Sequence, residues 1–175
     1  MDIFEIQKAN PKLFPQFSVK DVLFLYYNCP QRERILRLYS KHIQVNLTIS
    51  GKRIINFRGQ KYISNKNTGS FLKRSAYLQE LPSLDPGWKG LVFYLKEDYL
   101  RSVFEEFKPH LNLKDLPEQT LESILTFKIN DQIRNCFNSF LPYFGQDQEL
   151  PEALLESKFK ELLYIIFSHP NNKHI

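Results

Sequence analysis

The 175-residue sequence is poor in the residues that mark metalloproteins, nucleotide-binding enzymes and disulfide-rich secreted proteins. It has two cysteines, six glycines, one methionine and four histidines. The cysteines, Cys29 and Cys136, are far apart in the chain, which favours reduced thiols and a cytoplasmic protein. The glycines form no phosphate-binding pattern, and the histidines are too scattered to suggest a metal site. We therefore expect no cofactor and no metal.

Long hydrophobic runs and export signals are also missing. No stretch approaches about 18 apolar residues, so we predict no transmembrane helix and no membrane partner. Residues 1–7 lack the basic start and the apolar core of a signal peptide. No nucleophile elbow or other catalytic constellation is present, and we predict that the chain is not an enzyme.

The net charge of +5 hides a strong asymmetry along the chain. Residues 32–74 contain eleven Lys and Arg but a single acid, Glu33, whereas acids outnumber bases in the remainder. Such a basic segment indicates either an anionic partner or the solvated turns and faces of a β-sheet domain. No helix carries a basic recognition face, so we expect no direct reading of duplex DNA by this chain.

Apolar alternation predicts a β-rich N-terminal part. Residues 43–50 alternate strictly between apolar and polar, which predicts a strand with one buried and one solvated face. Gly51 and Lys52 then predict a turn, and the return over residues 53–57 predicts a hairpin. Further strands are predicted at residues 22–27, 62–63, 70–78 and 91–95.

The hydrophobic period changes to that of a helix after residue 95. Apolar residues recur at helical spacing over 100–107, 133–144 and 152–166, with a last short strand at 127–129. Asn130 or Asp131 can cap the second of these helices. The sequence therefore predicts a small β-barrel or sandwich followed by about three helices.

Three stretches share patterns with one family of regulators. Residues 42–54 read His-Ile-Gln-Val-Asn-Leu-Thr-Ile-Ser-Gly-Lys-Arg-Ile, and residues 68–78 read Thr-Gly-Ser-Phe-Leu-Lys-Arg-Ser-Ala-Tyr-Leu. They resemble strands of the cupin-like barrel in AraC/XylS-type transcriptional regulators. Residues 152–166, Glu-Ala-Leu-Leu-Glu-Ser-Lys-Phe-Lys-Glu-Leu-Leu-Tyr-Ile-Ile, are similar to the helix that precedes the DNA-binding region in the subgroup resembling type III secretion activators.

The resemblance implies an N-terminal regulatory domain of the α+β class, mainly β, with a cupin-like small barrel or jelly roll followed by about three helices. Residues 1–95 would be the sensing barrel and residues 96–170 the helical part with a C-terminal dimerisation helix. Residues 171–175 would begin the linker to a helix-turn-helix domain that is missing here. The metal-binding histidines of enzymatic cupins are missing as well.

The function implied by the resemblance is sensing and dimerisation. The barrel would bind a small-molecule effector or a regulatory protein, the domain would form a homodimer, and DNA would be bound only through the missing domain. A free-standing protein-interaction module and a cupin-type enzyme are the alternative interpretations.

Two sets of residues are candidate sites. One face of the last helix could form the dimer interface, or it could only pack on the chain's own sheet. Its residues are Leu155, Phe159, Leu162, Leu163 and Ile166. Other apolar residues alternate in strands and could line a ligand pocket in the barrel interior, or they could be plain core. These are Phe24, Tyr26, Val45, Leu47 and Phe93.

Overall fold

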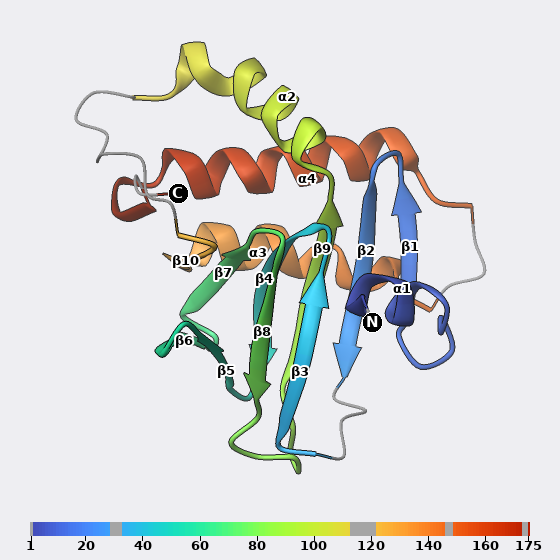
Figure 1. Cartoon of the computed structure of the whole chain (residues 1–175). Coiled ribbons are helices and arrows are strands. Elements are labelled where there is room, and N and C mark those ends of the chain that lie inside the picture. The colour runs from blue at the N-terminus through green and yellow to red at the C-terminus, as the bar shows by residue number, and fades with distance from the viewer. Residues whose placement is uncertain (1, 29–32, 113–121, 146–148, 173–174) are drawn as a thin grey trace.

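Two antiparallel β-sheets lie face to face in the computed structural model, which describes residues 2–28, 33–112, 122–145, 149–172 and 175 (Figure 1). The larger sheet has the strand order β1-β2-β9-β4-β7-β10, and the smaller has the order β3-β8-β5-β6. The strands are β1 (Gln16–Val19), β2 (Val22–Asn28), β3 (Ile35–Ser40), β4 (Ile43–Ser50), β5 (Arg53–Phe57), β6 (Gln60–Ser64), β7 (Thr68–Leu72), β8 (Ser75–Glu80), β9 (Lys89–Leu95) and β10 (Ile124–Lys128).

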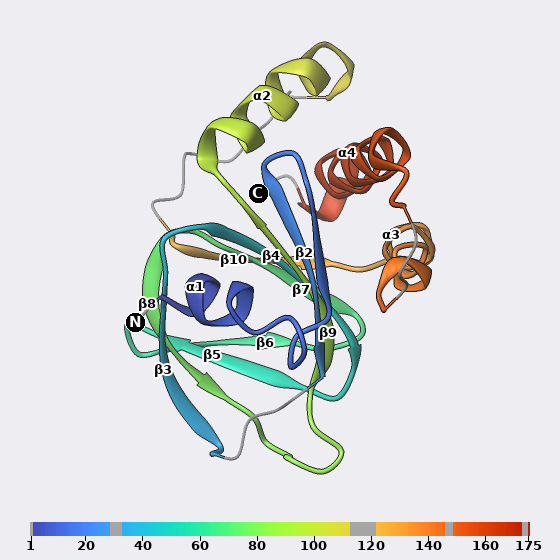
Figure 2. The same ribbon diagram turned by 90° about the vertical axis from the view of Figure 1, so that its right-hand side faces the viewer.

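Helices cover one side of this sandwich. Figure 2 shows α3 and α4 beside the six-stranded sheet, on the side away from the four-stranded sheet. The helices are α1 (Ile3–Lys8), α2 (Glu97–Phe107), α3 (Asp131–Asn138) and α4 (Glu152–Ser168), with short 3-10 turns η1 (Lys108–His110), η2 (Leu141–Tyr143) and η3 (Pro170–Asn172). The predicted mainly β, α+β class is confirmed, and α1 is a helix that the sequence did not reveal.

Local sequence signals explain where the helices begin. Asn130 is the N-cap of α3, and its side-chain oxygen accepts a hydrogen bond of 2.8 Å from the backbone N–H of Ile133. Pro151 is the N-cap of α4, and Pro170 lies just beyond its end, where it begins η3. None of the helices in the described part of the chain is both long enough and apolar enough to span a membrane.

Two of the turns that carry the chain from one sheet to the other differ from the sequence predictions. The predicted hairpin between β4 and β5 is wrong, because β4 belongs to the six-stranded sheet and β5 pairs with β6 and β8 in the other. Gly51 in this turn has a φ of +77°, and a Cβ there would lie 2.7 Å from the carbonyl oxygen of Gly87. The single strand predicted at 70–78 is likewise two strands, β7 and β8, which switch sheets at Lys73 and Arg74.

The sheets and helices share one core. Strand β10, although it follows residue 95, pairs with β7 at the edge of the six-stranded sheet. Buried Asn172, inside the segment predicted to begin a linker, connects this strand to α4. Its Oδ1 accepts a hydrogen bond of 2.9 Å from the Lys128 backbone N–H, and its Nδ2 donates one of 3.1 Å to the Ile166 carbonyl. The chain therefore remains packed on its sheet as far as this asparagine.

Candidate functional site

The predicted pocket residues do not line the space between the two sheets. They lie on the opposite face of β2, β4 and β9, in the core that α3 and α4 cover. Four of them are buried, and Tyr26 is partly buried against the same core. Their predicted place in the barrel interior is therefore wrong, since an apolar alternation does not tell which of two faces points inward. The set is Phe24, Tyr26, Val45, Leu47 and Phe93.

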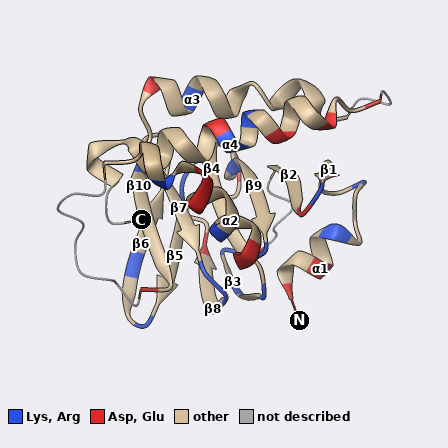
Figure 3. Ribbon diagram, turned by 90° about the horizontal axis from the view of Figure 1, so that it is seen from above, with Lys and Arg blue, Asp and Glu red and all other residues tan. Residues whose placement is uncertain are grey.

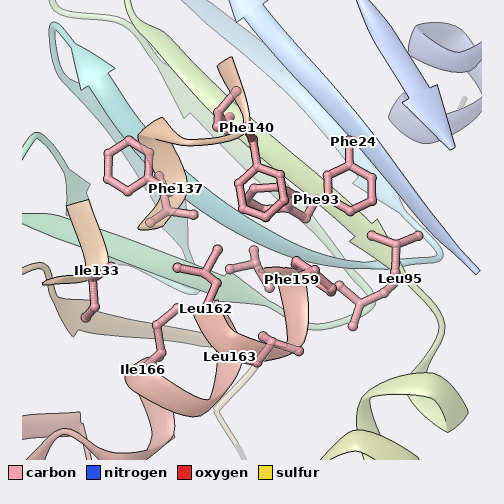
Figure 4. Close-up of a cluster of buried hydrophobic side chains, with 14 of the residues drawn as sticks. Phe24, Phe93, Leu95, Ile133, Phe137, Phe140, Phe159, Leu162, Leu163 and Ile166 are labelled. Carbon is pink, nitrogen blue, oxygen red and sulfur yellow. The ribbon is translucent and has the colours of Figure 1, made fainter. Parts of the chain in front are cut away.

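The residues predicted for the dimer interface form the other half of this core. Leu155, Phe159, Leu162, Leu163 and Ile166 are all 0% exposed. Figure 4 shows Phe159 against the sheet, where its ring centroid lies 5.4 Å from that of Phe24 and 5.1 Å from that of Phe93. In this chain the helix face packs on its own sheet, which was the alternative interpretation. Dimerisation stays a prediction, and it would need another surface.

The interior between the sheets holds buried polar side chains beside two apolar clusters. The side chains of Gln44, Asn46 and Thr48, predicted to face solvent, are fully buried there. The amide of Gln44 donates a hydrogen bond of 3.2 Å to the hydroxyl of Tyr77 on the opposite sheet. The indole N–H of Trp88 donates one of 2.9 Å to the Thr48 hydroxyl. The prediction of a solvated face is wrong because both faces of β4 are covered. Its apolar face packs under the helices, and its polar face meets the other sheet.

Helix α1 lies at one end of this interior. The hydroxyl of Tyr94 donates a short hydrogen bond to the side-chain oxygen of Gln7, and the ring of Phe4 packs edge-on to Tyr94 at 5.3 Å. The polar residues are thereby shielded from water at this end.

Arg53 is the most unusual residue of the interior. It is 2% exposed, and its guanidinium lies 4.4 Å from the ring centroid of Trp88. Its Nη1 donates a hydrogen bond of 3.3 Å to the side-chain oxygen of Gln79. Its Nε and Nη2 are buried without a hydrogen-bond partner, and within the described residues no acid lies within 4 Å to form an ion pair.

The charge on Arg53 is therefore uncompensated. Burial lowers the pKa of its guanidinium, yet an arginine stays protonated at neutral pH. Burial also raises the pKa of the nearby Tyr77 phenol, which stays neutral and supplies no counter-charge. Asn46, on the neighbouring sheet, also has both polar side-chain atoms buried without a partner. Unsatisfied buried groups of this kind are rare and indicate an absent ligand or an ordered water.

The free atoms of Arg53 have a defined geometry. The N–H groups of Nε and Nη2 form one edge of the planar guanidinium, and a carboxylate binds such an edge with two parallel hydrogen bonds. The described residues contain no cluster of His, Cys, Asp and Glu that could hold a metal ion. The interior is therefore suited to bind an anion or another strong acceptor.

Sequence reasoning missed this site, although one signal was present. The polar positions of β4 carry amides and a hydroxyl but no charge, whereas solvated strand faces commonly carry Lys or Glu. Arg53 itself gave no signal, because it follows a turn in a basic segment. Of the two cysteines, Cys136 is a half-buried free thiol, and Cys29 lies outside the described residues.

Solved structures of two proteins, ToxT and CuxR, share this fold. An apo form of ToxT from Vibrio cholerae matches with a TM-score of 0.63 and 14% identity, over 89% of this chain and 57% of that chain. Fatty-acid-bound ToxT from the same organism matches with a TM-score of 0.54 and 13% identity, over 85% and 55%. The AraC-like activator CuxR matches with a TM-score of 0.56 and 10% identity, over 87% and 54%. The chain thus spans just over half the length of these structures.

The sequence itself matches one family model. No curated protein sequence matches the chain significantly. The model of the ExsA N-terminal regulatory domain matches residues 44–175, which is most of the chain. This match and the fold confirm the predicted resemblance to the regulatory domains of AraC-type transcriptional regulators, with their cupin-like barrel. The chain belongs to the family of ExsA N-terminal regulatory domains.

Proposed function

We propose that this chain is the signal-receiving domain of an AraC-type transcriptional regulator, and that its barrel interior binds an effector bearing a carboxylate. The unpartnered edge of Arg53 carries this proposal. A buried cation without a counter-charge is unfavourable in the free protein, and a bound carboxylate would remove that deficit. The domain is then a binding module and not an enzyme.

The relatives support an acidic effector. ToxT from Vibrio cholerae has been solved with an unsaturated fatty acid and with a naphthyl-butenoic acid, and both ligands are carboxylic acids. At 13% identity these structures share only the fold with this chain, so the inference for this chain rests on its own arginine. An effector small enough to enter a packed interior could pair with the free polar atoms of Arg53 and Asn46.

The barrel and the helices would divide sensing from output, with residues 1–95 receiving the signal and residues 96–170 passing it on. Strand β4 connects the barrel interior directly to α4. Its residues that face the interior alternate with Val45 and Leu47, which pack under α4. A DNA-binding part after residue 170 would then receive the signal. A homodimer and a regulatory protein as the effector remain predictions about the same regulator.

Thermal unfolding with small carboxylates tests the effector class. Acetate, benzoate, succinate and hexanoate would be compared, with hexanamide as the neutral counterpart of hexanoate. A bound acid at about 100 times its Kd should stabilise the domain by about 2.7 kcal/mol, and hexanamide should not. The stabilisation should weaken in Arg53→Lys and disappear in Arg53→Met, whereas exposed Arg58→Met should retain it.

Two results would contradict the proposal. One is that no carboxylate stabilises the wild-type domain. The other is an acid-dependent stabilisation that is unchanged in Arg53→Met, since the acid would then bind elsewhere.

A further inference from the structure

A cavity of about 690 Å³ lies between α2 and the ends of β4, β7 and β10, and none of its lining residues belongs to the polar barrel interior. Its volume falls within the roughly 300–1,000 Å³ typical of small-molecule sites. Figure 3 looks down on α2, which lies across these strand ends. The apolar part of its lining includes Ile43, Phe71, Leu100, Phe104, Leu125, Phe167 and the last residue, Ile175.

Aromatic rings form one wall of this cavity. The ring of Phe167, from the end of α4, lies 5.9 Å from Phe104 of α2 and 6.0 Å from Phe71 of the sheet. On α2 only Val103 is buried, whereas Leu100 and Phe104 are half-buried. The apolar face of this helix is therefore incompletely covered, and an alkyl chain in the cavity would cover it.

The mouth of the cavity is cationic. Lys41, Lys73, Arg74 and Arg101 contribute to its lining, and Glu97 is the one acidic side chain among the described lining residues. The carboxylate of Glu97 pairs with Arg101 at 3.0 Å. The exposed side-chain ammonium groups of Lys41 and Lys73 form no ion pair or hydrogen bond with the described residues. These two cations remain available for an anion.

Strand register explains why the cations meet here. Ser40 pairs with Ser75, so that Lys41 and Arg74, the next residues beyond this pair, leave the sheet at the same end. In the other sheet Gln44 pairs with Leu72, and Lys73 follows directly. Both turns therefore place their basic residues over the same apolar cavity.

We propose that this cavity binds an amphiphilic anion, with the alkyl chain between α2 and the sheet and the acidic head group at Lys41 and Lys73. The proposal commits to a free amphiphile such as a fatty acid, and a phospholipid in a membrane is the other source of the same chemistry. It does not depend on the effector site at Arg53, because the two sites share no residue.

Calorimetric titration of the 175-residue chain with dodecanoate and with dodecanol tests this site. Lys41→Glu/Lys73→Glu should weaken dodecanoate binding about tenfold, because two attractions become two repulsions, and should leave dodecanol binding unchanged. The matched control is Arg34→Glu/Lys52→Glu, which reverses two exposed cations at the far ends of β3 and β4. This control should bind dodecanoate as the wild type does.

A third variant tests the apolar wall. Leu100→Trp should narrow the apolar part of the cavity and weaken binding of dodecanoate and of dodecanol alike, while the domain stays folded by circular dichroism. Arg53→Met should bind dodecanoate normally, so this site can fail or succeed independently of the barrel interior.

Three outcomes would overturn the proposal. The first is that dodecanoate does not bind, and the second is that Lys41→Glu/Lys73→Glu and its control weaken binding equally. The third is charge-dependent binding to phosphatidylglycerol vesicles without binding of free dodecanoate, which would identify a surface for membranes and not a cavity for a free ligand.

Discussion

Replacing Arg53 by methionine should stabilise this domain in the absence of ligand. The guanidinium is almost fully buried, and the described residues provide no acid to balance its charge. Methionine has a similar length, is apolar and adapts to irregular space, so it can fill the same volume without a charge. The substitution thus removes an unfavourable term and leaves the packing against Trp88 largely intact.

The expected magnitude follows from three contributions. Burying an ion costs several kcal/mol even after relaxation of its surroundings. Against this, stacking on Trp88 returns up to about 2 kcal/mol, and a hydrogen bond from a charged donor to Gln79 returns about 1.5 kcal/mol at its length of 3.3 Å. The remaining deficit of about 1–3 kcal/mol should appear as a rise in Tm of roughly 3–9 °C for a domain of this size.

Thermal and urea unfolding would measure this change. Arg53→Lys should be measured alongside, because it keeps the buried charge but loses the planar guanidinium. This variant should be less stable than the wild type. Arg58→Met is the matched control, since Arg58 is exposed over the ring of Phe57, and it should change stability by less than about 0.5 kcal/mol. If Arg53→Met instead loses more than about 1 kcal/mol, the guanidinium is a satisfied structural group, and the argument for a ligand there fails.

Three further predictions test the core and its surroundings. Leu162→Ala should lower the free energy of unfolding in urea by about 2–5 kcal/mol, because it leaves a cavity under α4. Leu154→Ala on the same helix, where Leu154 is 47% exposed, should change this free energy by less than about 0.5 kcal/mol. Equal effects of the two substitutions would refute the assigned core face. Asn172→Ala should cost about 1–3 kcal/mol through three lost hydrogen bonds, and exposed Asn171→Ala should cost almost nothing in the same urea titration. Burial raises the pKa of the Cys136 thiol from 9 to about 11. At pH 8 its alkylation by iodoacetamide, followed by peptide mass spectrometry, should therefore be about a hundredfold slower than in urea-unfolded protein. Equal alkylation rates in the folded and unfolded protein would contradict this prediction.

Most helices and strands could be located from the sequence, but not which strands pair with one another. Alternation identified β4, and helical spacing identified α2, α3 and α4, because both patterns arise from local geometry. The turn at residues 51–52 was misread, since a turn signal looks the same whether the next strand pairs with the previous one or crosses to the other sheet. The turn at residues 73–74 was missed, because Lys73 and Arg74 carry no turn signal. Strand β3 (Ile35–Ser40) went unnoticed because its apolar residues do not alternate strictly.

The candidate sites failed for a related reason. A period of two divides β4 into two faces but does not say which of them meets water, another sheet or a helix. Here all of Val45, Leu47, Asn46 and Thr48 are buried, the apolar pair under the helices and the polar pair between the sheets. An apolar set was therefore assigned to the ligand, although the polar set occupies the interior.

This division has a consequence for signalling by the proposed regulator. The residues that would respond to an effector and the residues that support α4 alternate along the same strand, so they share one backbone. A close-packed core transmits small displacements instead of absorbing them. If an acid bound at Arg53 shifted the interior side of β4, Val45 and Leu47 would shift with it against Phe93 and Phe159, and α4 would adjust. Leu47→Ala should therefore weaken the coupling between effector and α4 more than it weakens effector binding itself, because it touches only the helix side of the strand.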